Sequence, residues 1–277
     1  MDAHFQEYWW FLVSLLGALL VSLMFVQGAN SLLGSLGGDA EGRRLVVDAM
    51  GRKWMFTFAA LVVFGGVLYI GCLVGWMDFV GVESRWLWMM VGLSFVVQAV
   101  GYVCWNRVGK GLGERTVQGL LVQNGFMGPV LVGSGLAMLL EGEKLLSVWV
   151  LVFGIALFFL ARVLGTLYVI SKVEDVGVRS RASARLLGSA IAFVVLFVAY
   201  LVHWLLGDSF GKMWYLITLV LIGFLLILHA VVNSQLSTLN CQLSTVNCQL
   251  STLNSTPFFL ASAGTFLIVF SFLLGAG

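Results

Sequence analysis

Long apolar runs separated by short charged segments dominate this sequence. Charged residues are absent from 8–38, 54–77, 86–106, 116–140 and 186–206, and none follows Lys212. A helix of about 20 apolar residues crosses the hydrocarbon core of a bilayer. The pattern therefore predicts eight transmembrane helices, at residues 8–28, 54–77, 86–105, 118–140, 147–170, 186–206, 213–233 and 257–276.

The composition agrees with lipid as the solvent. Hydrophobic residues make up 60% of the 277 residues and charged residues only 10%, whereas a soluble domain carries about 25% charged residues. We therefore predict an all-α fold, a polytopic transmembrane bundle of about eight helices in two four-helix groups. Residues 1–277 form a single membrane domain, and the net charge of +2 gives no reason to expect nucleic acid.

Basic residues indicate the orientation. Eleven of the fifteen lie in the first, third and fifth predicted loops, and loops rich in Lys and Arg face the cytoplasm. The N-terminus, and with eight helices the C-terminus too, is then expected outside. The eleven are Arg43, Arg44, Arg52, Lys53, Arg107, Lys110, Arg115, Lys172, Arg179, Arg181 and Arg185.

Residues 235–255 are a tandem heptapeptide repeat, QLSTLNC, QLSTVNC and QLSTLNS. Its leucines and valine recur at heptad spacing, as in a short coiled coil. We favour a low-complexity linker, because Ser, Thr and Asn are poor helix formers and no charges flank the apolar seam.

Residues able to carry chemistry are sparse. His203 and His229 fall near opposite ends of their predicted helices, ~20 Å apart at 1.5 Å per residue, so they are not paired axial ligands of one haem. The sequence contains no metal-ligand cluster, phosphate loop or nucleophile triad. Metal ligands and catalytic residues are therefore predicted to be absent.

Polar side chains inside the predicted helices are the remaining candidates. Arg162 is the one charge well inside a span. It either contacts a partner's carboxylate, a cofactor propionate or a quinone, or it extends to the interface or caps backbone carbonyls. Four amides are expected to hydrogen-bond between helices, namely Gln27, Gln98, Gln123 and Asn124.

Four segments carry a resemblance to a known family. They are WWFLVSLLGALLVSLMFVQG at 9–28, GRKWMFTFAALVVFGG at 51–66, FVVQAVGY at 95–102 and LFFLARVLGTLYVI at 157–170. The basic RSRASARLL at 179–187 adds looser support. Together they resemble subunit II of the cytochrome bd ubiquinol oxidases over nearly the whole chain, apart from the repeat.

The resemblance implies a non-haem subunit of a respiratory complex in the inner membrane that oxidises quinol and reduces dioxygen to water. Haems b and d then belong to a partner, subunit I. This chain, in contact with membrane lipid, would hold no cofactor except a bound quinone, and would support assembly and proton or quinone access. The candidate residues for these roles are Gln27, Asp48, Trp54, Gln98 and Arg162.

The chain departs from the family pattern at two acids. Met55 follows Trp54 and Val103 follows Tyr102 where relatives commonly carry a carboxylate, and Asp48 lies two helical turns before Met55. The family usually has nine helices. Two alternatives stay open: a secondary transporter or channel, and a non-functional relic of the oxidase subunit.

Overall fold

A computed structural model describes residues 3–73, 82–105, 107, 112–141, 147–206, 214–243 and 255–275. Every regular element among these residues is a helix. The elements are α1 (Ala3–Phe25), the 3₁₀ helix η1 (Val26–Leu32), α2 (Leu33–Gly37), α3 (Ala40–Leu73), α4 (Val82–Trp105), α5 (Leu112–Glu141), α6 (Val148–Lys172), α7 (Val176–Leu206), α8 (Trp214–Leu243) and α10 (Thr256–Gly275).

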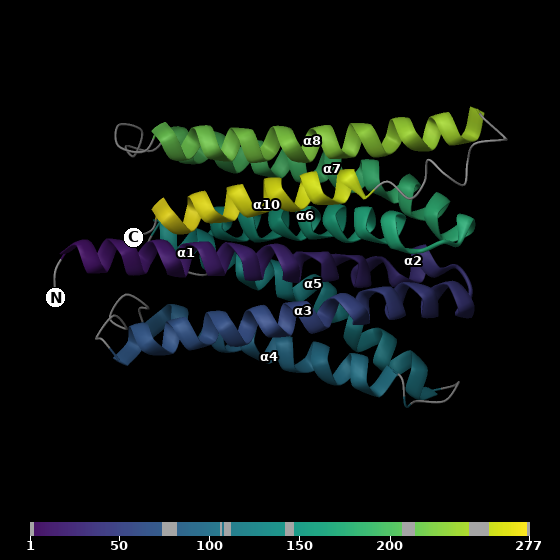
Figure 1. The fold of residues 1–277 in the computed structure, drawn as a ribbon, viewed down its shortest axis with the longest axis horizontal. Coiled ribbons are helices and arrows are strands. Elements are labelled where there is room, and N and C mark those ends of the chain that lie inside the picture. Colours follow the sequence, from purple (N-terminus) through teal and green to yellow (C-terminus); the bar gives the residue numbers. More distant parts are fainter. Residues whose placement is uncertain are drawn as a thin grey trace.

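The long helices run alongside one another as a bundle (Figure 1). Helices α1, α3, α4 and α5 occupy one side, and α6, α7, α8 and α10 the other. The two groups meet where α1 packs on α10 and where α5 and η1 pack on α6. The predicted class, a helical membrane bundle, is confirmed.

Within the described residues, seven helical segments are long and apolar enough to cross a membrane. They lie at Tyr8–Gly37, Trp86–Trp105, Gly113–Leu140, Val148–Lys172, Val176–Trp204, Ile217–Ser237 and Thr256–Leu274. The eighth predicted span, 54–77, falls on α3 and continues past Leu73 beyond the described part of the chain.

Three helices extend ten or more residues beyond their predicted spans. Helix α3 begins at Ala40 rather than 54, α7 begins at Val176 rather than 186, and α8 continues to Leu243 rather than 233. Apolar runs mark only the part of a helix that lies in lipid. The added turns of α3 and α7 each contain two alanines and three arginines, which are strong helix formers.

Carboxylates cap the extended helices. Asp39 Oδ1 accepts the backbone N–H of Gly42 at 2.8 Å at the start of α3. Asp175 Oδ1 accepts that of Val178 at 2.7 Å at the start of α7. Such caps satisfy amides that a helix start leaves unpaired.

The beginning of the repeat, 235–243, continues α8. Residues 244–254 lie outside the described residues, so the linker stays a prediction.

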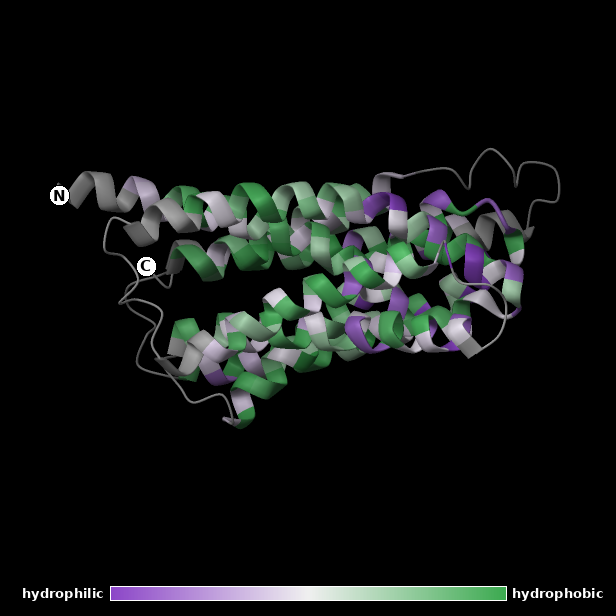
Figure 2. Ribbon diagram, turned by 90° about the horizontal axis from the view of Figure 1, so that it is seen from below, coloured by the Kyte–Doolittle hydropathy of each residue, from purple (hydrophilic) through white to green (hydrophobic). Residues whose placement is uncertain are grey.

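Hydrophilic residues gather at one end of the bundle (Figure 2). That end contains α2, the start of α3 and the turn between α6 and α7, whereas α1 begins and α10 ends at the opposite end (Figure 1). There Arg181 fastens α2 to α7, because its Nε and Nη2 donate to the carbonyls of Leu36 and Gly37 at 2.8 and 2.9 Å.

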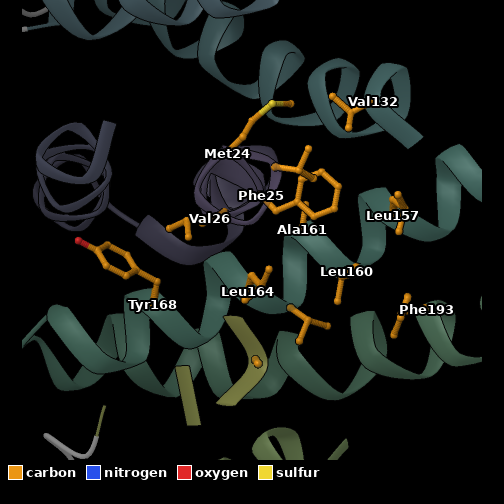
Figure 3. Close-up of a cluster of buried hydrophobic side chains, with 14 of the residues drawn as sticks. Met24, Phe25, Val26, Val132, Leu157, Leu160, Ala161, Leu164, Tyr168 and Phe193 are labelled. Atoms are coloured by element: carbon orange, nitrogen blue, oxygen red, sulfur yellow. The ribbon is translucent and has the colours of Figure 1, made fainter. Parts of the chain in front are cut away.

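Buried apolar side chains cluster where η1 crosses α6 (Figure 3). A Cβ on Gly165 would lie 2.3 Å from the backbone nitrogen of Ala29, and one on Gly28 would lie 2.3 Å from the carbonyl of Ala161. Only glycine therefore allows the two backbones to approach so closely. Buried apolar side chains surround the crossing, among them Phe25, Val26, Leu157, Leu160 and Leu164.

Candidate functional site

The structure brings together three of the five candidate residues. Gln27 on η1 and Gln98 on α4 are both buried, and Trp54 of α3 lies beside them. They meet around Tyr102, whose ring centroid is 6.3 Å from that of Trp54. This group, completed by Asn30, is called the Tyr102 cluster below.

The hydroxyl of Tyr102 is the centre of the cluster. It donates to Gln27 Oε1 and accepts from Asn30 Nδ2 at 2.7 Å. Gln98, one turn before Tyr102 on the same helix, is also buried. Asn30 Nδ2 donates to Gln27 Oε1 at 3.3 Å. Three side chains from two distant segments thus share one hydrogen-bonded network, as buried polar groups require.

Three polar atoms of the cluster remain without a partner among the described residues. They are Gln27 Nε2, Asn30 Oδ1 and the indole Nε1 of Trp54. A buried donor or acceptor left unpaired is costly, so such atoms commonly mark the place of a bound water or other polar guest. Two donors and one acceptor are therefore available to a guest here.

The 3₁₀ geometry of η1 positions the cluster. A Cβ on Gly125 of α5 would lie 2.8 Å from the backbone nitrogen of Ser31, so α5 packs closely on η1. Helix α6 also packs on η1. Ser31 Oγ donates to the carbonyl of Gly28 at 2.7 Å and holds the tightened turn. Short 3₁₀ segments within longer helices often occur at functional hinges.

The cluster can position hydrogen-bond donors and acceptors but contains no carboxylate or imidazole. Its one ionisable member is the phenol of Tyr102, whose ordinary pKa near 10 keeps it protonated at neutral pH. The arrangement suits orienting a neutral polar guest, or a chain of hydrogen bonds, rather than general acid–base chemistry.

Two candidates lie apart from the cluster. Asp48 is exposed on α3. It lies on the same continuous helix as Met55, two turns before it. Arg162 of α6 is half-buried, with its guanidinium 5.6 Å from the ring centroid of Phe158 and 5.5 Å from that of Phe159.

Burial and contacts distinguish the other polar residues that the sequence analysis singled out. Asn124 is buried and accepts a hydrogen bond from Ser94 at 2.8 Å, which confirms its predicted role between helices, whereas Gln123 is exposed. His203 stacks on Trp149 with ring centroids 4.0 Å apart. In the part of the chain that is described, no three His, Cys, Asp or Glu side chains gather as a metal site would require.

The sequence reasoning missed Asn30 as a site residue and met Tyr102 only within a longer motif. A signal was present, because Asn30 lies three residues after Gln27 and Tyr102 four after Gln98. Residues at these spacings share one face of a helix.

Comparison with known families agrees with the resemblance seen in the sequence. A family model described as cytochrome bd terminal oxidase subunit II matches residues 5–276. No individual curated protein matches the chain. Because the family match extends over nearly the whole chain, and the fold is the helical membrane bundle expected of it, this chain belongs to the family of cytochrome bd terminal oxidase subunit II.

Proposed function

We propose that this chain is the non-haem subunit of a quinol:oxygen oxidoreductase and that it supports assembly of a haem-bearing subunit I. It lies in the inner membrane with its N-terminus outside. The hydrophilic end of the bundle, which carries the basic residues of α3, α6 and α7, then faces the cytoplasm. By itself the chain catalyses no reaction, and haems b and d are held by the partner.

The observation that carries this proposal is the outer face of α3 and α4. Met55 of α3 and Val103 of α4 stand where the resemblance implies acids, and their side chains are 66% and 53% exposed. A carboxylate that faces lipid is costly. Acids at these positions are better accommodated if protein covers the face, so we infer that subunit I packs on α3 and α4.

Proton or quinone access is the second part of the proposal, and the Tyr102 cluster is its site. A quinone carbonyl or a water chain needs N–H or O–H donors, and Gln27 Nε2 and Trp54 Nε1 are buried donors without a partner among the described residues. A bound quinone would be held by these two groups. Asp48, which is exposed, would serve only as an outer acceptor of protons at the charged end.

Co-expression with a candidate subunit I tests the proposal. The complex is purified through a tag on this chain, and a reduced-minus-oxidised visible spectrum is recorded. Bands of haem b and haem d in material that contains both subunits are expected, because the partner brings the haems. Quinol-dependent oxygen consumption should accompany the bands.

Two other outcomes contradict parts of the proposal. A colourless preparation that contains this chain alone would overturn the partnership with a haem subunit. A coloured complex that consumes no oxygen would retain the assembly role and identify the chain as a relic in which the acids missing at Met55 and Val103 have abolished turnover.

A further inference from the structure

Asn30 completes the Tyr102 cluster from the 3₁₀ helix η1. Its side chain is fully buried, and that of Gln27, three residues earlier, is 2% exposed. A 3₁₀ helix has three residues per turn, so residues at this spacing on η1 lie directly above one another. The two amides therefore meet Tyr102 from the same side of η1.

Hydrogen bonds and packing hold the two amides in place. Asn30 Nδ2 donates to the hydroxyl of Tyr102 at 2.7 Å and to Gln27 Oε1 at 3.3 Å, and the hydroxyl itself donates to Gln27 Oε1. On α5, a Cβ added to Gly125 would lie 3.0 Å from the Cβ of Asn30. Helix α5 therefore packs directly against Asn30 and supports its side chain.

Each amide keeps one atom that no described group satisfies. These atoms are the donor Gln27 Nε2 and the acceptor Asn30 Oδ1. The demand does not depend on which atom of each amide is the oxygen. With both amides turned over, Gln27 would donate to the Tyr102 hydroxyl and that hydroxyl would donate to Asn30, and one donor and one acceptor would again be unpaired.

A guest that satisfies both atoms must accept one hydrogen bond and donate another. A hydroxyl group does so, because its oxygen accepts and its hydrogen is donated. The carbonyl oxygen of a quinone accepts from Gln27 Nε2 but leaves Asn30 Oδ1 unpaired, and a buried acceptor without a partner is costly. Trp54 Nε1, the third unpaired atom of the cluster, is a donor and suits either guest.

We infer that Asn30 makes the Tyr102 cluster selective for a hydroxyl group, that of water or of a hydroquinone, over the carbonyl of a quinone. This inference rests on the proposed function, in which the cluster serves proton or quinone access, and it names the chemical class of the guest. Water would make the cluster part of a hydrogen-bonded chain, whereas a hydroquinone would make it a site for the reduced form.

Binding of a short-chain benzoquinone and of its hydroquinone compares the two guests directly. The full chain is purified in mild detergent with any subunit that stays bound, and both dissociation constants are measured without oxygen. In the wild type, the hydroquinone should bind at least about tenfold more tightly, because the quinone leaves a buried acceptor unpaired. Asn30→Leu removes that acceptor and should abolish the preference. Sites on a bound subunit contribute equally to both proteins, so the difference between them is scored.

Infrared spectra recorded in ordinary water and in oxygen-18 water test the other source of a hydroxyl. A water molecule held by Gln27 and Asn30 should give an O–H stretching band that shifts with the isotope. The band should be absent from Asn30→Leu. Isotope-sensitive absorption without hydroquinone binding would identify water as the guest, and hydroquinone binding would identify the reduced quinone.

Two further variants show whether any effect belongs to this acceptor. Asn30→Asp keeps an oxygen at the same position and should retain the selectivity. Asn124→Leu removes another buried amide, which accepts from Ser94 at 2.8 Å outside the cluster, and should leave both measurements unchanged. Melting temperatures show whether each variant is folded. The wild-type comparison needs no variant and stays decisive if Asn30→Leu does not fold.

A wild type that binds the quinone as tightly as the hydroquinone would overturn the inference. So would a wild type that binds neither compound and shows no isotope-sensitive band, or a preference and a band that persist in Asn30→Leu. The haem spectrum of the same material tests the proposed function separately. Missing haem bands contradict the partnership, whereas a missing preference in haem-containing material contradicts this inference alone.

Discussion

At the scale of single residues, the hydroxyl of Tyr102 links α4 to η1. This hydroxyl is the only atom that joins the amide of Gln27 on η1 to α4 in the described hydrogen bonds. These partners are buried where water is scarce. Without the hydroxyl, the amides of Gln27 and Asn30 would lose a partner that nothing else replaces, and an unpaired buried amide costs more than the bond itself contributes.

We therefore expect Tyr102→Phe to destabilise the protein by about 1–3 kcal/mol, the cost of unpaired buried polar groups. Thermal unfolding in detergent measures the change. Tyr8→Phe is the matched control, because the Tyr8 side chain is 60% exposed and the same hydroxyl is lost there at little cost. If Tyr102→Phe is as stable as the control, the hydroxyl does not hold η1 to α4.

The sequence predicted the amides of this cluster but not its arrangement. Gln27 and Gln98 were expected between helices, because an amide inside an apolar run needs a partner. That Asn30 would join them depends on η1, whose 3₁₀ turns of three residues shift the faces that an α-helix would present. Arg162 was predicted inside a span, and the structure shows its side chain half-buried on α6 with the guanidinium against Phe158 and Phe159.

At the scale of elements, the close crossing of η1 and α6 determines the geometry of the cluster. Hydropathy predicted where helices lie, because burial in lipid requires apolar runs. It could not predict how far α3, α7 and α8 continue beyond the membrane, or which glycines meet another backbone. Of the glycines in α6 and α7, Gly165 faces the backbone of η1, whereas Gly188 faces open space.

Substitution of these two glycines by alanine should have opposite effects. Gly165→Ala would place a Cβ 2.3 Å from the nitrogen of Ala29, so η1 must move away from α6. We expect a loss of about 1–3 kcal/mol, typical of overpacking. Gly188→Ala has no such conflict and should stabilise α7 by up to about 1 kcal/mol through helix propensity.

Unfolding of the two variants in the same detergent compares them directly. A Gly165→Ala variant with parental stability would show that η1 and α6 are farther apart than the structure places them.

At the scale of the whole molecule, the bundle exposes two broad apolar faces. One lies on α3 and α4, and the other lies on α7 and α8. Lipid and a partner subunit are both apolar surroundings, so sequence hydropathy could not distinguish the two faces. The acids that the resemblance implies at positions 55 and 103 would distinguish them, because Met55 is exposed on α3 and Val103 on α4.

Two matched lysine substitutions separate a partner interface from a lipid-facing surface. Val96 of α4 and Leu225 of α8 are 58% and 63% exposed, and both lie near the middle of their helices. A lysine costs roughly 2.5–3.5 kcal/mol at the centre of a membrane helix, so both variants carry a similar insertion cost. In Val96→Lys the lysine would also be covered by subunit I, where its amine could not extend to the membrane surface as that of a lipid-facing lysine can.

We expect Val96→Lys to lower the yield of haem-containing complex at least about tenfold, which corresponds to ~1.4 kcal/mol of lost association energy. Leu225→Lys should keep most of that yield. Haem absorbance is divided by the amount of tagged chain after purification. This quotient gives the yield of haem-containing complex per chain, independently of expression level. The reverse result would place subunit I on α7 and α8. The acids that the resemblance implies at positions 55 and 103 would then need another explanation.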